Sequence, residues 1–562
     1  MLSIETVFSI PILVVGGVAA VHATAYLHGE ARRHLTRFWS FFTATLAAMA
    51  AVVWVDGKVP FLLAWEAMGL ASAGLVAFES REKGVRKATW IYLLACHAGA
   101  CALMLAGVQM MRPEAWTGAF LCAMIGFGLK IGFPPFHAWL PEAHPAAPAP
   151  ASAIMSGAMI PLGFYGLLKF FPVAGLPPSS VSLYGWALLI LGGLGAFGGI
   201  LFALPQANLK KLLAFSSVEN MGVVAMGLGL SVLLSGADAL RPVSVLCLAG
   251  ALVHVLNHAF LKGALFLVAG SVLRQTGTLD QDKLGGLLRR MPITGTLFVF
   301  HAFGLSGLPP LNGFMGELVL YIGAFSAIKT GEPMLVAAGF LVAVTLALTG
   351  GLAVAVYTKA VGGVFLGEPR SRAAADAVET PRRMWIAPLV LAVLSLAMVP
   401  GTVFLVHRMT GGLATEMVMV TALLGWTFVL ITGALLFFRR FICPRGAQKP
   451  RVPVWDCGYD RPTARMAYTA TAFTQPTVDY FRPLLRTRRH VRPFRGDPAS
   501  PTDAAIATET DDLAISGFWR PLFIRAARFC QRMHLLQNGS LHLYILIILV
   551  AVLALLVFAL VS

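Results

Sequence analysis

The chain has 562 residues, a formal net charge of +17, 57% hydrophobic residues and only 12% Asp, Glu, Lys and Arg. A soluble domain carries about twice that charged fraction. This composition, with 56 glycines that let helices approach closely, indicates a polytopic membrane protein and excludes disordered, fibrous and disulfide-rich classes.

Seven cysteines are spread along the sequence, and no two of them form a CxxC pair. Iron–sulfur clusters and structural zinc sites usually need thiolates at such spacing. The sequence also lacks a nucleotide-binding fingerprint and a haem motif. We therefore interpret the cysteines as small apolar side chains and expect no metal site or redox centre in this chain.

Apolar stretches set the predicted fold. A helix needs roughly 20 apolar residues to cross the hydrocarbon core of a bilayer, so we predict an all-α protein of about 14 transmembrane helices. Glu5 precedes the first stretch and no basic segment leads it, which favours a retained helix over a cleaved signal peptide. The stretches are residues 5–28, 39–55, 59–78, 88–110, 116–133, 151–171, 182–204, 212–235, 244–273, 293–328, 334–365, 384–407, 416–438 and 541–560.

The loops between the predicted helices alternate in charge, because basic residues gather in the loops that follow odd-numbered stretches. Loops that follow even-numbered stretches carry single charges such as Lys58 and Arg241. Basic loops stay cytoplasmic, so we expect a bacterial or archaeal inner-membrane protein with both termini outside the cytoplasm. The loops that follow odd-numbered stretches hold the basic residues Arg32, Arg33, Arg37, Arg81, Lys83, Arg86, Lys87, Lys210, Lys211, Arg274, Lys283, Arg289, Arg290, Arg370, Arg372, Arg382 and Arg383.

Residues 439–540 form the one long polar segment, with 17 Lys and Arg against 8 Asp and Glu, and the same alternation predicts that it is cytoplasmic. Residues 487–512 are typical of a flexible link. Residues 515–536 predict an amphipathic helix, which would lie at the membrane surface or under a partner subunit. A solvated linker whose arginines reach lipid headgroups is the alternative interpretation.

Isolated charges inside apolar stretches are the candidate functional residues. An ionisable group in hydrocarbon costs about 2.5 to 3.5 kcal/mol on insertion scales, so those that are retained usually face a protein interior or an aqueous path. The candidates are Glu66, Lys130, Lys169, His254, His258, Lys262 and Glu317.

His254, His258 and Lys262 are spaced four residues apart, which puts them on one face of one helix. Three stacked titratable groups indicate a proton relay. Two histidines four apart can also bind zinc, but Lys262 is a poor neighbour for a cation. A stack of structural histidines with satisfied hydrogen bonds is the other alternative.

Glu66 and Lys130 each lie alone in an apolar sequence, on different predicted helices. A buried carboxylate and a buried amine are tolerated best as a pair, and a change in their separation would move a proton. A static ion pair that only joins two helices is the alternative.

Two predicted helices contain helix breakers at membrane depth. Residues 132–150 follow Lys130, and residues 304–313 precede Glu317. Breaks beside buried charges are how transporters expose backbone groups to an ion path. The similar layout of the two regions, each with a Pro-Pro pair, suggests an internal repeat, although a simple proline kink would also explain either one.

From about residue 26 to residue 365 the sequence resembles the proton-translocating, antiporter-like subunit family. Respiratory NADH:quinone oxidoreductase, multisubunit cation/proton antiporters and membrane-bound hydrogenases share this family. The PEAHPAAP and VENMG segments, with WDCGYDRPTARMAYTATAF at 455–473, are most similar to the large membrane subunits of hydrogenase-4 and formate hydrogenlyase type complexes. The motifs are WEAMGLAS at 65–72, KIGFPPFHAWLPEAHPAAPAPASA at 130–153, NLKKLLAFSSVENMG at 208–222, HVLNHAFLKGALFLVAGSV at 254–272 and GLPPLNGFMGE at 307–317.

The resemblance implies a bundle with two inverted five-helix repeats and two broken helices. It implies that Glu66 and Lys130 are the charge-switching pair of a first half-channel, and that the His254, His258 and Lys262 relay leads to Glu317 in a second. Accessory roles would fall to Lys169, His137 and Lys210. It also implies other membrane subunits and a peripheral redox arm, whose subunits would hold nickel–iron and iron–sulfur centres or flavin.

Three positions depart from this family pattern. Glu66 lies on the third predicted helix here, whereas the family usually carries it on the fifth. Pro161 stands where this branch commonly has Lys, and Lys169 lies eight residues further on, roughly 12 Å along a helix. Asn208 stands where an acidic residue is usual.

The leading hypothesis is a proton-translocating or sodium-translocating subunit of a redox-driven complex, without redox chemistry of its own. A non-pumping membrane anchor is an alternative, favoured by Pro161. A subunit of a cation/proton antiporter or of an inorganic-carbon uptake system is another. The predicted regions are N-terminal helices at 1–58, an antiporter-like core at 59–365, additional helices at 366–438, the basic segment at 439–540 and a last helix at 541–562.

Overall fold

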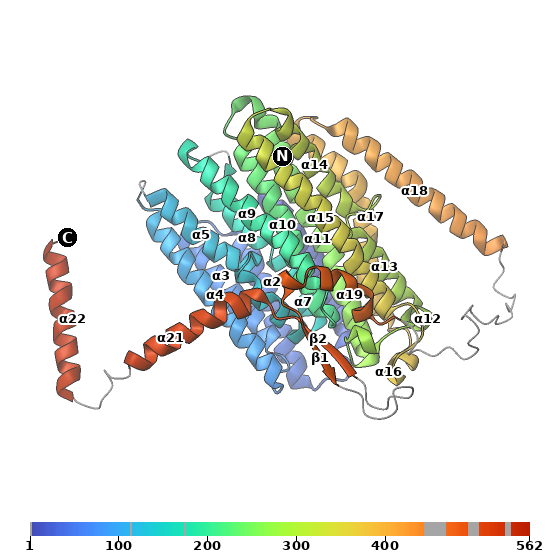
Figure 1. The fold of residues 1–562 in the computed structure, drawn as a ribbon, viewed down its shortest axis with the longest axis horizontal. Coiled ribbons are helices and arrows are strands. Elements are labelled where there is room, and N and C mark those ends of the chain that lie inside the picture. The colour runs from blue at the N-terminus through green and yellow to red at the C-terminus, as the bar shows by residue number, and fades with distance from the viewer. Residues whose placement is uncertain are drawn as a thin grey trace. The chain divides into compact units, whose positions relative to one another are not determined.

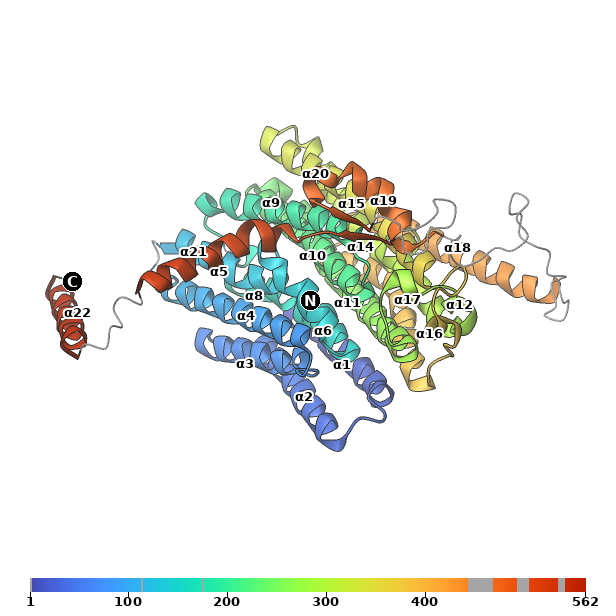
Figure 2. The same ribbon diagram turned by 60° about the horizontal axis from the view of Figure 1, so that its bottom comes forward.

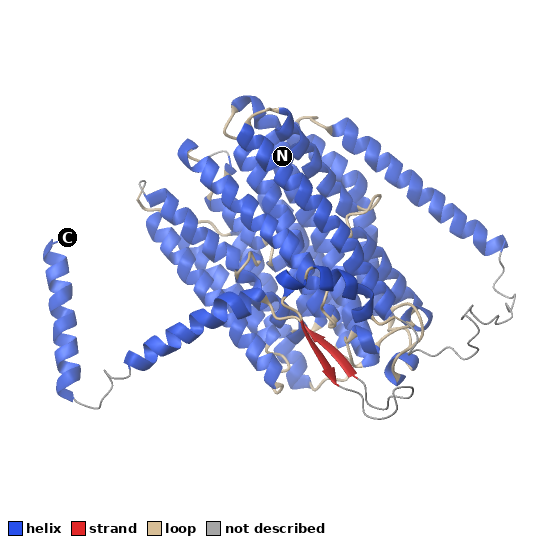
Figure 3. Ribbon diagram, in the orientation of Figure 1, coloured by secondary structure: helices blue, strands red, loops and turns tan. Residues whose placement is uncertain are grey.

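A computed structural model describes residues 3–112, 115–173, 176–442, 468–492, 505–533 and 541–561 of the chain. The chain divides into two units, Met1–Thr510 and Asp511–Ser562. Helices make up most of both units, and one pair of strands lies in the described part of the first (Figure 3).

The long helices of the first unit form a bundle in which α10 and α11 lie between the N-terminal helices and α13 to α17 (Figure 1 and Figure 2). Apolar side chains at nearly every position let α10 bury all its faces along its whole length, whereas outer helices such as α4 and α18 keep exposed apolar faces. The long helices are α1 (Ile4–Tyr26), α2 (Arg32–Trp54), α3 (Lys58–Val76), α4 (Lys83–Gln109), α5 (Trp116–Ile131), α9 (Pro178–Ala203), α10 (Leu209–Leu234), α11 (Arg241–Thr276), α15 (Pro333–Val364), α17 (Arg382–Thr410) and α18 (Thr415–Ile442).

A seam of small residues joins α9 and α10. A Cβ atom at Gly192 would lie 2.8 Å from the backbone oxygen of Gly222, and one at Gly199 would lie 2.8 Å from that of Phe215. A side chain at Gly222 would collide with the backbone of Ala196. The two helices therefore pack backbone against backbone, as small residues permit in membrane proteins.

Both predicted helix breaks are present. After α5 the chain forms a 3-10 turn (Phe136–Trp139), α6 (Leu140–Ala146), α7 (Ala149–Ile154), a π turn (Met155–Met159) and α8 (Leu162–Phe170). The second break separates α13 (Pro292–Leu305) from α14 (Asn312–Lys329). Each break contains one cis peptide bond, Pro134-Pro135 or Pro309-Pro310. The inverted repeat itself stays a prediction.

Short helices and 3-10 turns connect the long helices of the first unit. The 3-10 turns are Asp238–Leu240 and Gln281–Lys283, and the short helices are α12 (Leu287–Arg290), α16 (Arg372–Ala375), α19 (Ala470–Tyr480) and α20 (Arg482–Leu485).

The helix α19 is held against the bundle by its hydrogen bonds. The backbone N–H of Thr471 donates to Asp282 at 2.9 Å, and its hydroxyl also donates to that carboxylate. The Thr474 hydroxyl donates to the Leu204 carbonyl at 3.3 Å. Part of the basic polar segment is therefore attached to the loops at the ends of α9 and α11.

The predicted flexible link at 487–512 is wrong for its two ends. Strands β1 (Arg488–Arg492) and β2 (Ala505–Glu509) pair antiparallel, with Arg488 opposite Glu509 and Val491 opposite Ile506. The pairing depends on the register of two segments that are apart in the sequence, and composition alone does not reveal it. Residues 493–504, like 443–467 with Cys443 and Cys457, lie outside the described part.

The second unit contains a π turn (Ala514–Trp519), α21 (Arg520–Met533) and α22 (Leu541–Val561). The predicted amphipathic helix at 515–536 is confirmed as a helix over Arg520–Met533, and residues 534–536 lie outside the described part. Leu522, Ala526 and Phe529 recur at helical spacing along one side of α21, and Arg528 and Gln531 lie on the other.

Twelve helices among the described residues are long and apolar enough to cross a membrane, and Pro292–Leu305 and Tyr544–Val557 are shorter apolar helices. Each of the fourteen predicted stretches coincides with one helix or with a broken pair of helices. The chain is therefore a multi-span membrane protein whose membrane-crossing elements are helices, as predicted, and the count of fourteen stays a prediction.

Candidate functional site

The three predicted relay residues lie along one buried face of α11. His254, His258 and Lys262 are 2%, 1% and 0% exposed. Their spacing puts successive side chains about 6 Å apart along the helix axis. The predicted alignment on one helix is therefore present in the structure.

Lys262 lies where α10, α11 and α15 meet. Its Nζ donates to the Ser216 hydroxyl at 2.9 Å, to the Tyr357 hydroxyl at 3.1 Å and to the Leu213 carbonyl at 3.4 Å. The Ser216 and Tyr357 hydroxyls are 2.8 Å apart. All three donor positions of the ammonium group therefore have an oxygen acceptor.

A carboxylate that we did not select from the sequence lies beside this cluster. The Ser216 hydroxyl donates to Glu219 Oε2 at 3.0 Å, and Asn220 Nδ2 donates to the same oxygen at 2.7 Å. Glu219 is buried. It lies inside the predicted apolar stretch 212–235, so the criterion that selected Glu66 applied to it equally.

Asn220 continues the cluster to His254. Its Oδ1 lies 3.2 Å from His254 Nε2. A chain of polar contacts thus runs from Lys262 through Ser216, Glu219 and Asn220 to His254. This chain connects two members of the relay through α10 rather than along α11 alone.

His258 lies on α11 between those two ends. Neither of its ring nitrogens has a hydrogen-bond partner among the described residues of the chain. Its ring therefore differs from that of His254, whose Nε2 contacts Asn220. A proton can bind to His258 without breaking a hydrogen bond within this part of the protein.

Glu317 lies on α14, just after the second break. A Cβ atom at Gly307 would lie 2.7 Å from Glu317 Oε2, so the carboxylate rests against the backbone of the break. A Cβ atom at Gly316 would lie 2.9 Å from His254 Nδ1. The turn that carries Glu317 therefore packs directly on the His254 end of the relay.

Lys130 is buried at the end of α5, before the first break. Its Nζ lies 3.3 Å from the Tyr92 hydroxyl and 3.4 Å from Cys96 Sγ. It also lies 5.7 Å from the centre of the Trp65 ring. These contacts join α3, α4 and α5 around one ammonium group.

Glu66, next to Trp65 on α3, contacts the ring of His97 on α4. Its Oε2 lies 3.1 Å from His97 Nδ1, with the Glu66 side chain 30% exposed. His97 was not among the candidates from the sequence, although it lies in the predicted stretch 88–110. Direct pairing of Glu66 with Lys130 stays a prediction.

The three accessory candidates lie in separate places. Lys169 Nζ donates to the Val55 carbonyl at 2.7 Å, and Val55 ends α2, so this lysine caps a helix. His137 lies in the first break, with its ring 6.2 Å from that of Phe215. Lys210 is buried at the start of α10 and donates to the Ala147 carbonyl at 2.7 Å.

Lys359 and His144 are two further buried polar residues that the sequence reading missed. Lys359 lies in the predicted stretch 334–365 and donates to the Leu204 and Gln206 carbonyls at 2.6 and 2.9 Å, where α9 ends. His144 lies in the first break.

Metal ligands do not gather in the described ranges, where no three His, Cys, Asp or Glu side chains converge as a binding site. His254 Nε2 faces an amide oxygen instead. The relay residues offer proton donors and acceptors, and the absence of a metal site in the chain stays a prediction.

The fold and the buried titratable side chains define a polytopic membrane protein with two broken helices and a connected polar cluster in its core. The sequence model described as "NADH:quinone oxidoreductase/Mrp antiporter, TM" matches residues 59–346. The chain belongs to this family.

Relatives of known complexes align over most of the chain. Hydrogenase-4 component B of Escherichia coli (strain K12) is 32% identical, over 99% of this chain and 88% of that protein. Formate hydrogenlyase subunit 3 of the same organism is 33% identical, over 80% of this chain and 75% of that protein.

A solved structure shares the fold. A chain of the membrane-bound sulfane sulfur reductase, an archaeal respiratory membrane complex, superposes with a TM-score of 0.73 at 21% identity. The superposition covers 99% of this chain and 88% of that one. The resemblance noted in the sequence is thus confirmed at the level of family and fold.

Proposed function

We propose that this chain is the ion-translocating membrane subunit of a redox-driven complex, and that it moves protons. The observation that carries the proposal is the contact chain from Lys262 through Ser216, Glu219 and Asn220 to His254, next to the turn of Glu317. Buried charges in a membrane protein are costly and usually mark an ion path.

In this mechanism each residue holds or moves one proton. A change at the partner interface alters the surroundings of Glu66 and Lys130, and the altered charge favours proton release or uptake at Lys262. His258 and His254 pass the proton toward Glu317, and Glu219 balances the charge of Lys262 through Ser216. One proton that crosses 100 mV needs about 2.3 kcal/mol, and a tenfold change in proton affinity is worth about 1.4 kcal/mol. A change in proton affinity of roughly two tenfold steps is therefore sufficient to move one proton against 100 mV.

The redox chemistry belongs to partner subunits in this proposal. The relatives named above are subunits of hydrogenase-4 and of formate hydrogenlyase, which supports a peripheral arm with nickel–iron and iron–sulfur centres or flavin. We also propose the inner membrane of a bacterium or archaeon as the location, with residues 439–540 in the cytoplasm and both termini on the other side.

A second candidate function is a membrane anchor that does not pump. The observation that favours it is Pro161, a buried residue that precedes α8 where this branch commonly carries Lys. An anchor would keep its contacts with the partner subunits but would transfer no protons between the two halves.

Reconstitution separates these functions. The chain and its co-purifying subunits are placed in liposomes, redox turnover is started, and proton movement is followed with a pH-sensitive dye in sodium-containing and sodium-free buffer. Lys130→Ala and Glu317→Gln should abolish proton movement while the complex stays assembled. Unchanged turnover and an unchanged proton gradient in both variants would leave the anchor as the better description. Loss of transport only when sodium is removed would identify sodium as the ion.

A further inference from the structure

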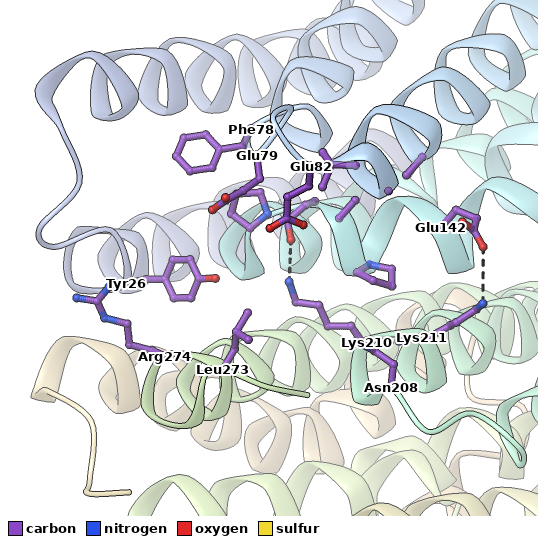
Figure 4. A pocket seen from close by; sticks show the side chains of 18 of the residues that line it. Tyr26, Phe78, Glu79, Glu82, Glu142, Asn208, Lys210, Lys211, Leu273 and Arg274 are labelled. Carbon is purple, nitrogen blue, oxygen red and sulfur yellow. Dashed lines mark hydrogen bonds and ion pairs between the residues drawn. The ribbon is translucent and has the colours of Figure 1, made fainter. Parts of the chain in front are cut away.

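A cavity of about 690 Å³ opens between the ends of α1, α4, α6, α10 and α11 (Figure 4). It lies at the loops that carry the predicted cytoplasmic basic residues, since Arg274, Lys210 and Lys211 line it. Acidic residues line it as well, and these are Glu30, Glu79, Glu82 and Glu142. The cavity is therefore a polar recess on the side of the basic loops, which the loop charges predict to be cytoplasmic.

The charges around the cavity are arranged by depth. Lys211 pairs with Glu142 at 3.6 Å, and both are partly exposed. Lys210 is only 1% exposed, and its side chain points toward Glu82 in Figure 4. Exposed carboxylates thus surround the opening, and a buried ammonium group reaches the cavity from inside the protein.

His144 lies behind this ammonium group. It precedes by three residues Ala147, whose carbonyl accepts the hydrogen bond from Lys210 at 2.7 Å. Its ring is fully buried, and neither ring nitrogen has a hydrogen-bond partner among the residues that the structure describes. Buried polar groups are nearly always satisfied, so an imidazole with two unused nitrogens is a feature that needs a role.

The surroundings of His144 connect the cavity with the relay. Its ring stacks on Phe266 with 4.8 Å between the ring centres. Phe266 follows Lys262 by one helical turn on α11. The histidine is thus linked to the cavity through the chain segment whose Ala147 carbonyl accepts from Lys210, and to the relay helix through its contact with Phe266.

We propose that this cavity is the aqueous entrance for protons, and that Lys210 and His144 deliver them to Lys262. The inference rests on the proposed function and adds the route by which protons reach Lys262. Each cycle moves one proton. The Lys210 ammonium donates to one ring nitrogen of His144, the other ring nitrogen donates to a neutral Lys262, and water in the cavity reprotonates Lys210.

Substitutions at the two carriers test the route in the reconstituted complex. Lys210→Met removes the charge, whereas Lys210→Arg keeps the charge and a donor to Ala147 but holds its proton too tightly to exchange it. Both should reduce proton movement at least tenfold. Lys87→Met, at an exposed lysine outside the cavity, should stay within twofold of the unmodified chain.

His144→Gln should likewise reduce proton movement at least tenfold. Its matched control is His301→Gln, because His301 is also buried but bonds to the Leu297 carbonyl of its own helix at 2.7 Å. Wild-type rates of proton movement in Lys210→Met, Lys210→Arg and His144→Gln would contradict the proposed entrance. A wild-type complex that moves no protons would overturn the proposed function instead.

A thiol block tests the cavity in a protein with all its carriers intact. Gly84 lines the cavity and a Cβ atom there meets nothing within 4 Å, so Gly84→Cys should fold normally. Lys87→Cys lies on the same helix and is exposed outside the cavity. A bulky, membrane-impermeant methanethiosulfonate reagent is added to either face of the vesicles, and the unsubstituted chain controls for its own cysteines.

Reagent on the face of the basic loops should stop proton movement in Gly84→Cys and leave Lys87→Cys active. Complete labelling of Gly84→Cys without inhibition would show that protons do not pass through the cavity. Labelling only from the opposite face would contradict a cytoplasmic entrance.

Discussion

Asn257 on α11 and Asn312 at the start of α14 hold one another by two hydrogen bonds. Asn257 Nδ2 donates to the Asn312 carbonyl at 2.7 Å, and Asn312 Nδ2 donates to Asn257 Oδ1 at 3.1 Å. Asn257 precedes His258 directly, and Asn312 follows the second break. The relay helix and the broken helix are therefore joined at one buried amide pair.

Asn312→Ala should weaken this junction. The variant leaves the buried Asn257 side chain with one bond fewer, which costs about 1 to 3 kcal/mol. Thermal unfolding of the detergent-purified complex should show a lower midpoint than the wild type. Ser326→Ala is the control, since Ser326 bonds only to the Ile322 carbonyl of its own helix at 2.7 Å. Equal midpoints for Asn312→Ala and the wild type would contradict a stabilising role.

Glu219→Gln should stop proton movement without disturbing assembly. The amide oxygen of Gln can still accept from Ser216 and Asn220, so the packing is kept, but the negative charge near Lys262 is lost. We expect proton movement to fall at least tenfold, in keeping with the usual size of acid–base effects of about 10²- to 10⁴-fold. Dye-monitored uptake during redox turnover measures it. Glu332→Gln, at an exposed position before α15, should have no effect, and full transport in Glu219→Gln would remove that carboxylate from the path.

Lys169→Met distinguishes a helix cap from a relay residue. Lys169 binds the Val55 carbonyl and lies 3.3 Å from the Tyr165 hydroxyl. Its loss should reduce stability by about 1 kcal/mol while proton movement stays within twofold. Transport and midpoint are measured on the same preparation, and a tenfold loss of transport would restore Lys169 to the proton path.

Gly313→Ala should disrupt the second break. A Cβ atom at Gly313 would collide with the Gly304 carbonyl, where the end of α13 meets the start of α14. We expect a large loss of assembled protein, which gel filtration of solubilised membranes measures. Gly350→Ala is the matched control, because nothing lies within 4 Å of its Cβ position on α15. Normal yield from Gly313→Ala would show that the two helix ends can separate at little cost.

The sequence made the titratable residues of the core visible because a charge in an apolar stretch is conspicuous. Lys130, His254, His258 and Lys262 are buried as expected, and the breaks near Lys130 and Glu317 were predictable from their prolines. Glu219 meets the same criterion, since it is a charge within the apolar stretch 212–235, although we did not select it.

The hydrogen-bond partners of these residues were harder to predict than their burial. The bond between Asn220 and His254 joins residues 34 positions apart on different helices, and periodicity within a helix carries no information on such contacts. The His97 partner of Glu66 likewise depends on how α3 meets α4. The strands β1 and β2 were missed because their pairing depends on register, whereas the prediction used composition.

The glycine seam between α9 and α10 also limits where the protein can move. Backbone packed on backbone leaves no space for one helix to slide along or rotate against the other. These two helices therefore form a single rigid body that holds Glu219 and Asn220 in place. A conformational step of the proposed transport cycle would therefore have to move α9 and α10 together, with Glu219 and Asn220 carried along unchanged.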